Sequence, residues 1–288
     1  MIDFNQQGIL RLGSRGSALA LVQANRIKDL LVSKFPQINV EIVIIKTSGD
    51  INQGEISALG GKSIFVKEIE LALLNNEIDI AVHSFKDITS QPVAGLSYSA
   101  FLLEERSTDA LILFDPSKTM ADQLTIATGS LRRQSLCAHL YPTITCVPIR
   151  GNIDSRIKQA KEKNYDGVIL STAGLQRLGL DHLISVELNP EQFIPAPGQG
   201  MLAIQHRSDD SQSQHMVQAI GNNTDNALGQ LYFSFLQGIS FNCNLPLGAS
   251  ISDQNIHIFI CKNKPKYLTF PISECNAAIS AVREEAYV

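Results

Sequence analysis

Apolar runs rich in valine and isoleucine alternate with stretches of helical periodicity along the first two thirds of the chain. The runs are short and carry few charges, as buried strands do. They cover residues 40–46, 79–83, 125–128, 144–149, 167–170 and 202–205, and a shorter run covers 9–12. Strands that alternate with helices favour mainly parallel sheets covered by helices, which is an α/β fold.

Two helices are predicted from apolar residues that recur every three or four positions. The first follows Ser17, a residue type suited to cap a helix N-terminus. Its apolar positions are Leu21, Ala24, Ile27 and Leu31. The second follows Lys62, and its apolar positions are Phe65, Ile69 and Leu73.

The alternation breaks at a segment rich in proline and glycine, residues 195–200, and one more strand follows it. A chain of 288 residues is also long for one compact domain. We therefore predict that the chain crosses between two α/β lobes and ends in a small α+β domain. Domain 1 comprises residues 1–104 and 199–222, domain 2 residues 105–198, and domain 3 residues 223–288. Domain 3 opens with a helical pattern at Leu228, Leu231 and Phe235.

Composition excludes several classes of protein. The formal charge of -4 and the absence of a basic run argue against a general nucleic-acid binder. No stretch is apolar enough for a membrane helix, and residues 1–16 lack the apolar core of a secretory signal. The five cysteines are widely spaced, so neither a disulfide framework nor a zinc site is expected. A reducing, cytoplasmic setting is the simplest interpretation.

Arginine is locally abundant in this acidic chain. Residues 126–156 contain four arginines, no lysine and a single acid, Asp154. Guanidinium groups bind carboxylates or phosphates through two parallel hydrogen bonds, so the excess favours a ligand with several negative charges. The alternative is that any one of these arginines forms a structural ion pair or lies on a solvated face. The four are Arg132, Arg133, Arg150 and Arg156.

The arginines follow predicted strands directly. Arg132 and Arg133 come after strand 125–128, and Arg150 comes after strand 144–149. Ligands of open α/β sheets bind at the carboxyl ends of strands, beside helix N-termini that also attract anions. Arg15 has the same position after strand 9–12 in the first lobe. We expect the two lobes to present these groups to one cleft.

Asp87 closes the segment 79–87, after a predicted strand. It is either a turn or capping aspartate, or a carboxylate that stabilises a developing cation and moves its protons. His83, within the strand, is interpreted as a core histidine.

Two loops contain further candidates. Residues 60–63 read Gly-Gly-Lys-Ser, but a phosphate-binding loop needs glycine where Ile56 stands, so nucleotide binding is rejected. Lys62 remains a candidate at the mouth of a cleft. Cys243 lies in a loop rich in polar and turn residues. A free cysteine is usually a small buried apolar residue, and that alternative stays open.

Six segments in order resemble the porphobilinogen deaminase family over nearly the whole chain. They are residues 12–20 (LGSRGSALA), 79–87 (DIAVHSFKD), 129–134 (GSLRRQ), 150–156 (RGNIDSR), 173–179 (AGLQRLG) and 197–200 (PGQG). The resemblance implies three domains, of which the first two are like type II periplasmic binding proteins. It also implies a cytoplasmic, monomeric transferase of tetrapyrrole (heme) biosynthesis. Its substrate is porphobilinogen, with no nucleic-acid, membrane or metal partner.

The same resemblance assigns roles to residues. Cys243 would hold a dipyrromethane cofactor through a thioether, Asp87 would be the catalytic carboxylate, and Lys62 would belong to a loop at the site. The cofactor's acetate and propionate groups would be held by Ser84, Lys86, Thr128, Ser130, Arg132 and Arg133. The substrate and the growing chain would be bound by Arg15, Ser17, Arg150, Arg156, Arg177 and Gln199.

The implied reaction joins four porphobilinogen molecules into hydroxymethylbilane on the covalent primer, with loss of ammonia. Each porphobilinogen that loses ammonia gives an azafulvenium cation, which a carboxylate such as Asp87 would stabilise. Every pyrrole carries two carboxylates, so a growing chain of pyrroles would need the arginine excess.

The chain departs from the family pattern at three places. Phe241 and Asn242 precede Cys243 where the family has two glycines, Tyr232-Phe233 replaces an acidic-basic pair, and Ser63 replaces a glycine. The main alternative function is a non-catalytic two-lobed binding protein for an anionic small molecule. That alternative explains the arginines but not a third domain with a loop cysteine.

Overall fold

The computed structural model describes residues 8–47, 66–91, 93–103, 105–240 and 245–287. The chain forms two compact units, each built from two separate stretches. The first unit combines Met1–Glu104 with Met201–Phe233, and the second combines Glu105–Gly200 with Ser234–Val288. No helix within the described residues is long and apolar enough to cross a membrane.

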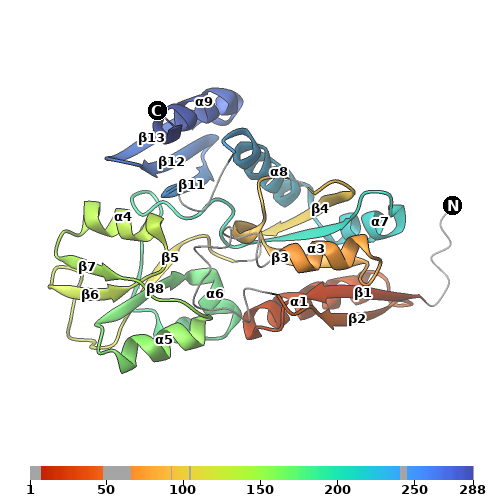
Figure 1. Cartoon of the computed structure of the whole chain (residues 1–288), viewed down its shortest axis with the longest axis horizontal. Coiled ribbons are helices and arrows are strands. Elements are labelled where there is room, and N and C mark those ends of the chain that lie inside the picture. Colours follow the sequence, from red (N-terminus) through yellow and green to blue (C-terminus); the bar gives the residue numbers. More distant parts are fainter. Residues whose placement is uncertain (1–7, 48–65, 92, 104, 241–244, 288) are drawn as a thin grey trace. The chain divides into compact units, whose positions relative to one another are not determined.

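The first unit has one five-stranded sheet in the order β2-β1-β3-β10-β4 (Figure 1). Strands β1, β2 and β3 are parallel, and β10 is antiparallel to both of its neighbours. The strands are β1 (Ile9–Ser14), β2 (Asn39–Ile44), β3 (Ile80–Ser84), β4 (Leu96–Leu103) and β10 (Met201–Arg207).

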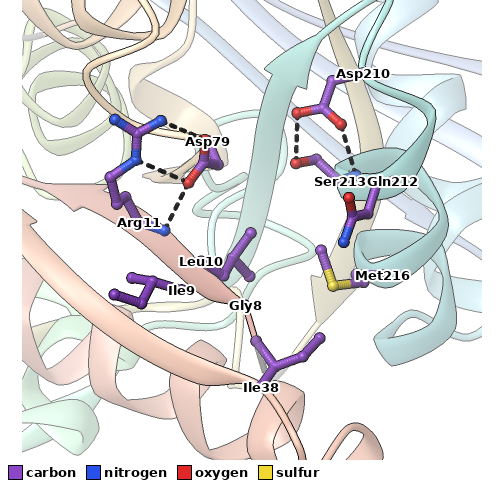
Figure 2. Close-up of a pocket in the computed structure, with 10 residues that line it drawn as sticks. All are labelled: Gly8, Ile9, Leu10, Arg11, Ile38, Asp79, Asp210, Gln212, Ser213 and Met216. Atoms are coloured by element: carbon purple, nitrogen blue, oxygen red, sulfur yellow. Dashed lines mark hydrogen bonds and ion pairs between the residues drawn. The ribbon is translucent and has the colours of Figure 1, made fainter. Parts of the chain in front are cut away.

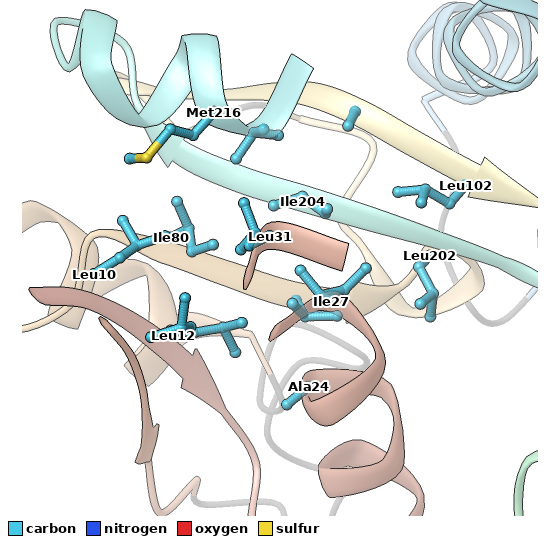
Figure 3. Close-up of a cluster of buried hydrophobic side chains, with 14 of the residues drawn as sticks. Leu10, Leu12, Ala24, Ile27, Leu31, Ile80, Leu102, Leu202, Ile204 and Met216 are labelled. Atoms are coloured by element: carbon cyan, nitrogen blue, oxygen red, sulfur yellow. The ribbon is translucent and has the colours of Figure 1, made fainter. Parts of the chain in front are cut away.

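Helices cover both faces of this sheet. On one face, α1 (Ala18–Lys34) and α7 (Ser211–Ile220) pack against alternate strand residues. Figure 3 shows Ile27 and Leu31 of α1 among side chains from the strands beneath them. On the other face, α3 (Lys67–Leu74) packs on Ala81 and its neighbours. Burial of each apolar face against a helix stabilises the unit by removing that surface from water.

Local sequence explains where α1 begins. The Ser17 side chain accepts a hydrogen bond from the backbone N–H of Ala20 at 3.3 Å, as an N-cap residue does. The predicted apolar positions Ala24, Ile27 and Leu31 are buried, which confirms the predicted helix. In the second predicted helix, Ile69 and Leu73 are buried in α3, whereas Lys62 and Phe65 lie outside the described residues.

The second unit has a five-stranded sheet in the order β7-β6-β8-β5-β9. Its strands are β5 (Asp109–Leu113), β6 (Leu124–Ala127), β7 (Ile144–Val147), β8 (Gly167–Ser171) and β9 (Val186–Glu187). Helix α4 (Leu131–Leu140) covers one face, and α5 (Ile153–Glu162) and α6 (Thr172–Arg177) contribute to the core on the other.

A small antiparallel sheet also belongs to the second unit (Figure 1). It consists of β11 (Leu247–Ser252), β12 (Asn255–Cys261) and β13 (Pro265–Pro271), with α9 (Cys275–Tyr287) packed on it. Helix α8 (Asn223–Gly238) begins in the first unit and ends in the second. Three short 3₁₀ turns complete the described elements: Phe85–Asp87, Asp181–Leu183 and Ile272–Glu274.

The predicted α/β class with a small C-terminal α+β part is confirmed, and each predicted strand is present. The two large sheets share one strand pattern, with three parallel strands followed by a reversed strand and an outer strand. The reversed strand is β10 in one sheet and β5 in the other. β10 begins at a boundary between the units, and β5 begins four residues after one. The predicted boundaries of three domains remain a prediction.

Candidate functional site

The ends of β1 and β3 in the first unit carry five of the predicted site residues. These strands are parallel, so their carboxyl ends lie at one edge of the sheet. Arg15 and Ser17 follow β1, whereas Ser84, Lys86 and Asp87 close β3 and the turn after it. Gln23 of α1 is buried and donates a hydrogen bond from Nε2 to Ser84 Oγ at 2.8 Å. This bond fixes the end of β3 to α1, the helix that Ser17 caps.

Asp87 is the last residue of the 3₁₀ turn Phe85–Asp87. Phe85 anchors the turn, because its side chain is fully buried and its ring lies 5.4 Å from that of Phe101 and 6.0 Å from that of Tyr232. Asp87 is only partly buried. Its charge acts on His83, and its carboxylate has no hydrogen bond or ion pair within the described part of the chain. Asp87 caps no helix in the described part of the chain.

His83 is a buried core histidine, as predicted, with 5% of its surface exposed. Its Nε2 lies 3.1 Å from Gln205 Oε1, and Gln205 Nε2 donates to Glu70 Oε1 at 3.2 Å. Because the Gln205 amide nitrogen faces Glu70, its oxygen faces His83, and the neutral imidazole carries its proton on Nε2. Burial lowers the pKa of His83 to about 4, against the opposing influence of Gln205 and Asp87. Burial also raises the pKa of Glu70.

In the second unit, the loop between β6 and α4 places Thr128 and Ser130. Ser130 caps α4, since its Oγ accepts from the backbone N–H of Arg133 at 3.4 Å. The buried Thr128 accepts from the backbone N–H of Ser130 at 3.3 Å. Between them, a Cβ on Gly129 would lie 2.6 Å from the backbone oxygen of Ile149, so only glycine fits. These contacts set the position of the α4 N-terminus.

Arg132 and Arg133 are both buried, and both bind the fully buried Asp109 at the start of β5. Arg132 Nη1 lies 2.7 Å from Asp109 Oδ2. Arg133 donates to Oδ1 from Nη2 at 2.7 Å and from Nε at 3.0 Å. Burial opposes the charge of Asp109, but the two guanidinium groups outweigh it and hold the pKa of this carboxyl well below its usual range.

This cluster has an excess of positive charge, with two guanidinium groups facing one carboxylate. Arg133 directs its third donor, Nη1, to the backbone oxygen of Ile169 at 3.0 Å. Arg132 uses only Nη1, which also donates to Ile194 O at 2.8 Å. Nε and Nη2 of Arg132 form no hydrogen bond to any residue that the structure describes. The cluster therefore has the charge and the donors to bind one more anion.

Gln199 contributes to the same cluster. Its amide donates to the backbone oxygens of Ser107 at 2.7 Å and Thr108 at 2.9 Å, and to Asp109 Oδ1 at 3.0 Å. Gln199 is 2% exposed, so its amide group acts as an internal link between Asp109 and the chain before it.

The other predicted arginines follow β7 and β8. Arg150 is exposed directly after β7. Arg156 on α5 donates from Nε to Gly151 O at 2.6 Å, and Arg177 on α6 donates from Nη2 to Gly200 O at 2.7 Å. β6 is parallel to both β7 and β8, so the residues that follow these strands share one edge of the sheet. The expectation that the arginines follow strands at their carboxyl ends is confirmed within this unit.

Asp109 was not anticipated from the sequence, although a signal was present. The segment 109–113 reads Asp-Ala-Leu-Ile-Leu, so an acid opens a strongly apolar strand. A buried carboxylate needs cationic or hydrogen-bonding partners. The sequence signal is therefore the acid itself, whereas its partners, the arginine pair, become apparent only in the fold.

A separate cavity of about 180 Å³ lies at the opposite, amino-terminal end of β1 (Figure 2). The charged groups that line it are paired: Arg11 Nη2 lies 2.7 Å from Asp79 Oδ1, and Asp210 Oδ2 lies 2.8 Å from Nη2 of Arg207, which is outside the lining. None of the predicted site residues that the structure describes lines this cavity.

Two predicted site residues, Lys62 and Cys243, lie outside the described residues. Within the described part, histidine, cysteine and acidic side chains form no cluster of three or more that could hold a metal ion.

Comparison with known proteins identifies the family. The model described as "Porphobilinogen deaminase, dipyromethane cofactor binding domain" matches residues 10–215. The chain belongs to the porphobilinogen deaminase family. The porphobilinogen deaminase of Ehrlichia chaffeensis is 38% identical over 282 residues, which cover 95% of each chain. The porphobilinogen deaminase of Syntrophomonas wolfei is 41% identical over 255 residues, or 86% of this chain and 83% of that protein.

Solved structures show a more distant likeness. The periplasmic VFT2 domain of Bordetella pertussis BvgS aligns with a TM-score of 0.46 at 14% identity, over 78% of this chain and 92% of that domain. A TRAP periplasmic solute binding protein from Desulfovibrio salexigens gives 0.46 at 10% identity, over 80% of this chain and 77% of that protein. Likeness at this level carries no argument about the ligand, which rests on the family match alone.

Proposed function

We propose that the chain is a transferase of tetrapyrrole biosynthesis that joins four porphobilinogen molecules into hydroxymethylbilane, with loss of ammonia. The primer is a dipyrromethane attached to Cys243 through a thioether. One observation carries this proposal beyond family membership. The Arg132, Arg133 and Asp109 cluster is buried, has an excess positive charge, and leaves two donor groups of Arg132 without a hydrogen bond to the described residues.

The donor set fits the carboxylates of a dipyrromethane. Arg132 offers Nε and Nη2, and the N-terminus of α4 adds backbone N–H groups beside Ser130. Thr128 and Ser130 supply hydroxyl groups at the same loop, while Ser84 and Lys86 supply a hydroxyl and a cation after β3. When bound, dipyrromethane supplies the pyrrole α-carbon to which the first substrate is joined.

Asp87 acts on the substrate. A carboxylate that is partly buried and uncommitted to the described residues can stabilise the positive charge that develops as ammonia leaves, and can accept and return protons. Arg15, Arg150, Arg156 and Arg177 bind the carboxylates of the substrate and the growing chain, and Ser17, Gln199 and Lys62 contribute to the same binding. Arg156, Arg177 and Gln199 also bind backbone oxygens, which fixes their orientation.

The proposal includes a cytoplasmic monomer with three domains, the third of which carries Cys243. Size-exclusion chromatography with light scattering tests the monomer directly, since an elution mass near 31.5 kDa is expected.

Intact-mass spectrometry tests cofactor attachment. Purified, matured protein should carry the mass of two pyrrole units, and Cys243→Ser should remove it. The matched control is Cys275→Ser on α9, which should keep the adduct. An unmodified wild-type chain that binds a small anion without consuming porphobilinogen would instead support the binding-protein alternative, which family membership does not favour.

The role of Asp87 is tested separately. Asp87→Asn should fold, keep the adduct and lose nearly all turnover of porphobilinogen, because the neutral amide neither stabilises a cation nor takes up its proton. Asp29→Asn, on the exposed surface of α1, is the control and should keep wild-type turnover. Near-normal turnover of Asp87→Asn would remove Asp87 from the mechanism.

A further inference from the structure

Helix α4 and strand β7 bring two cysteines together in the second unit. Cys137 lies on the face of α4 that packs on the sheet, next to Leu136. Cys146 follows Ile144 by two residues on β7, so both side chains point to the α4 face. All four side chains belong to or border one apolar cluster. α4 packs on β7, so the two thiols are near enough to influence each other's ionisation, and neither cysteine is in a disulfide.

The two thiols differ in access and in acidity. Cys137 has no exposed surface, whereas Cys146 is partly exposed. Interaction with Cys137 lowers the pKa of Cys146, against the effect of burial. Interaction with Cys146, together with burial, raises the pKa of Cys137. Since the thiolate is the form that reacts, Cys146 is the nucleophile of the pair and Cys137 remains a thiol beside it.

We propose that Cys137 and Cys146 form a reversible intramolecular disulfide when the protein meets a peroxide. The Cys146 thiolate attacks one oxygen of hydrogen peroxide, the O–O bond breaks, and hydroxide leaves with Cys146 as a sulfenic acid. The Cys137 sulfur then attacks the Cys146 sulfur as its proton passes to the departing oxygen, the Cys146 S–O bond breaks, and water leaves. The hydroxide of the first step takes up the proton that Cys146 released when it ionised. In total, two thiols and one peroxide give one disulfide and two waters.

The disulfide would join the helix that carries the arginine cluster to its neighbouring strand. Cys137 follows Arg133 by four residues, which is about one helical turn. β7 leads directly to Arg150, a predicted substrate-binding residue. The proposal is independent of the proposed function, because it depends only on the packing of α4 against β7.

Peptide mapping of the oxidised holoprotein tests the disulfide. The folded protein is treated with equimolar hydrogen peroxide, remaining thiols are blocked with N-ethylmaleimide, and the protein is digested without reductant. The expected product is a Cys137–Cys146 linked peptide that dithiothreitol converts back to two free peptides. Cys261 and Cys275 serve as internal controls and should be recovered as maleimide adducts.

Single substitutions test the order of the steps. Cys137→Ser removes the second thiol, so Cys146 should accumulate as a sulfenic acid that dimedone traps. Cys146→Ser should give no dimedone adduct at Cys137, because the remaining thiol is buried. Circular dichroism before treatment checks that both variants are folded. Absence of the linked peptide in wild-type protein while Cys261 or Cys275 is oxidised would overturn the proposal, whatever the variants do.

Discussion

Asp109→Asn should strongly destabilise the second unit, although asparagine has nearly the same size and shape as aspartate. Asp109 is fully buried and accepts hydrogen bonds from Arg132, Arg133 and Gln199. Asparagine keeps the shape but loses the negative charge, and it replaces one acceptor oxygen with an N–H₂ group that faces a guanidinium donor. Two buried arginines would then lack their only carboxylate partner among the described residues.

Removal of one partner from a buried ion pair costs about 3–5 kcal/mol, because the remaining charge stays buried and unpaired. A change of 1 kcal/mol moves the melting temperature of a domain of this size by about 2–4 °C. Asp109→Asn should therefore lower the melting temperature of the second unit by roughly 6–20 °C.

Differential scanning calorimetry at pH 7 measures this shift in apoprotein and holoprotein. Asp115→Asn is the matched control, because Asp115 lies shortly after the same strand, is exposed and bonds only within its own turn to Ser117. It should melt close to wild type. The difference between wild type and Asp109→Asn should persist above a pH of about 4 and shrink as pH falls further. The difference shrinks at low pH because the pKa of Asp109 is lowered in the folded state, and protonation of Asp109 removes its stabilising charge.

A melting temperature of Asp109→Asn within 2–3 °C of wild type, roughly the effect of 1 kcal/mol, would refute this reasoning. It would mean that the guanidinium groups find other partners or water when the carboxylate is neutral.

Three further substitutions probe the interior around the site. His83→Gln should reduce the loss of stability at acid pH. Because the pKa of His83 is lowered in the folded state, the stability it contributes is present above about pH 6.5 and is lost toward pH 4, with about 2 kcal/mol lost by pH 5. Urea unfolding at pH 7 and pH 5 measures this difference. Gly129→Ala should cost about 1–3 kcal/mol in the same assay, because its Cβ would lie 2.6 Å from Ile149 O. Ser130→Ala should remove the cap of α4 at a cost of about 1 kcal/mol, detected as faster amide exchange in its first turn.

Local sequence was sufficient for elements whose pattern repeats within a few residues. The α1 helix follows from a cap at Ser17 and apolar positions that include Ile27 and Leu31, and both of these are buried as expected. β4 was not predicted, because Ser97 and Ser99 interrupt its apolar pattern. α4 was not predicted either, because it buries two arginines, whereas a hydrophobic pattern assigns arginine to the solvent-exposed face of a helix.

The candidate residues were proposed from sequence, some because they carry charge and follow a strand, and the others from the family resemblance. Their partners were not. Arg132 and Asp109 are separated by 23 residues in sequence, and Gln199 lies 90 residues from Asp109. No pattern among neighbouring residues in the sequence indicates such a pairing.

The sequence by itself determined seven strands of the two large sheets, the first helix, the α/β class and the strand-end positions of the arginines, because period, capping and charge are local properties. Tertiary structure alone decided that β5 and β10 run against their neighbours, and that Arg132 and Arg133 share one buried carboxylate. These features depend on which strands become neighbours in a sheet. That choice is made when distant segments bury their apolar faces together, and a buried charge is stable only where such packing supplies its partner.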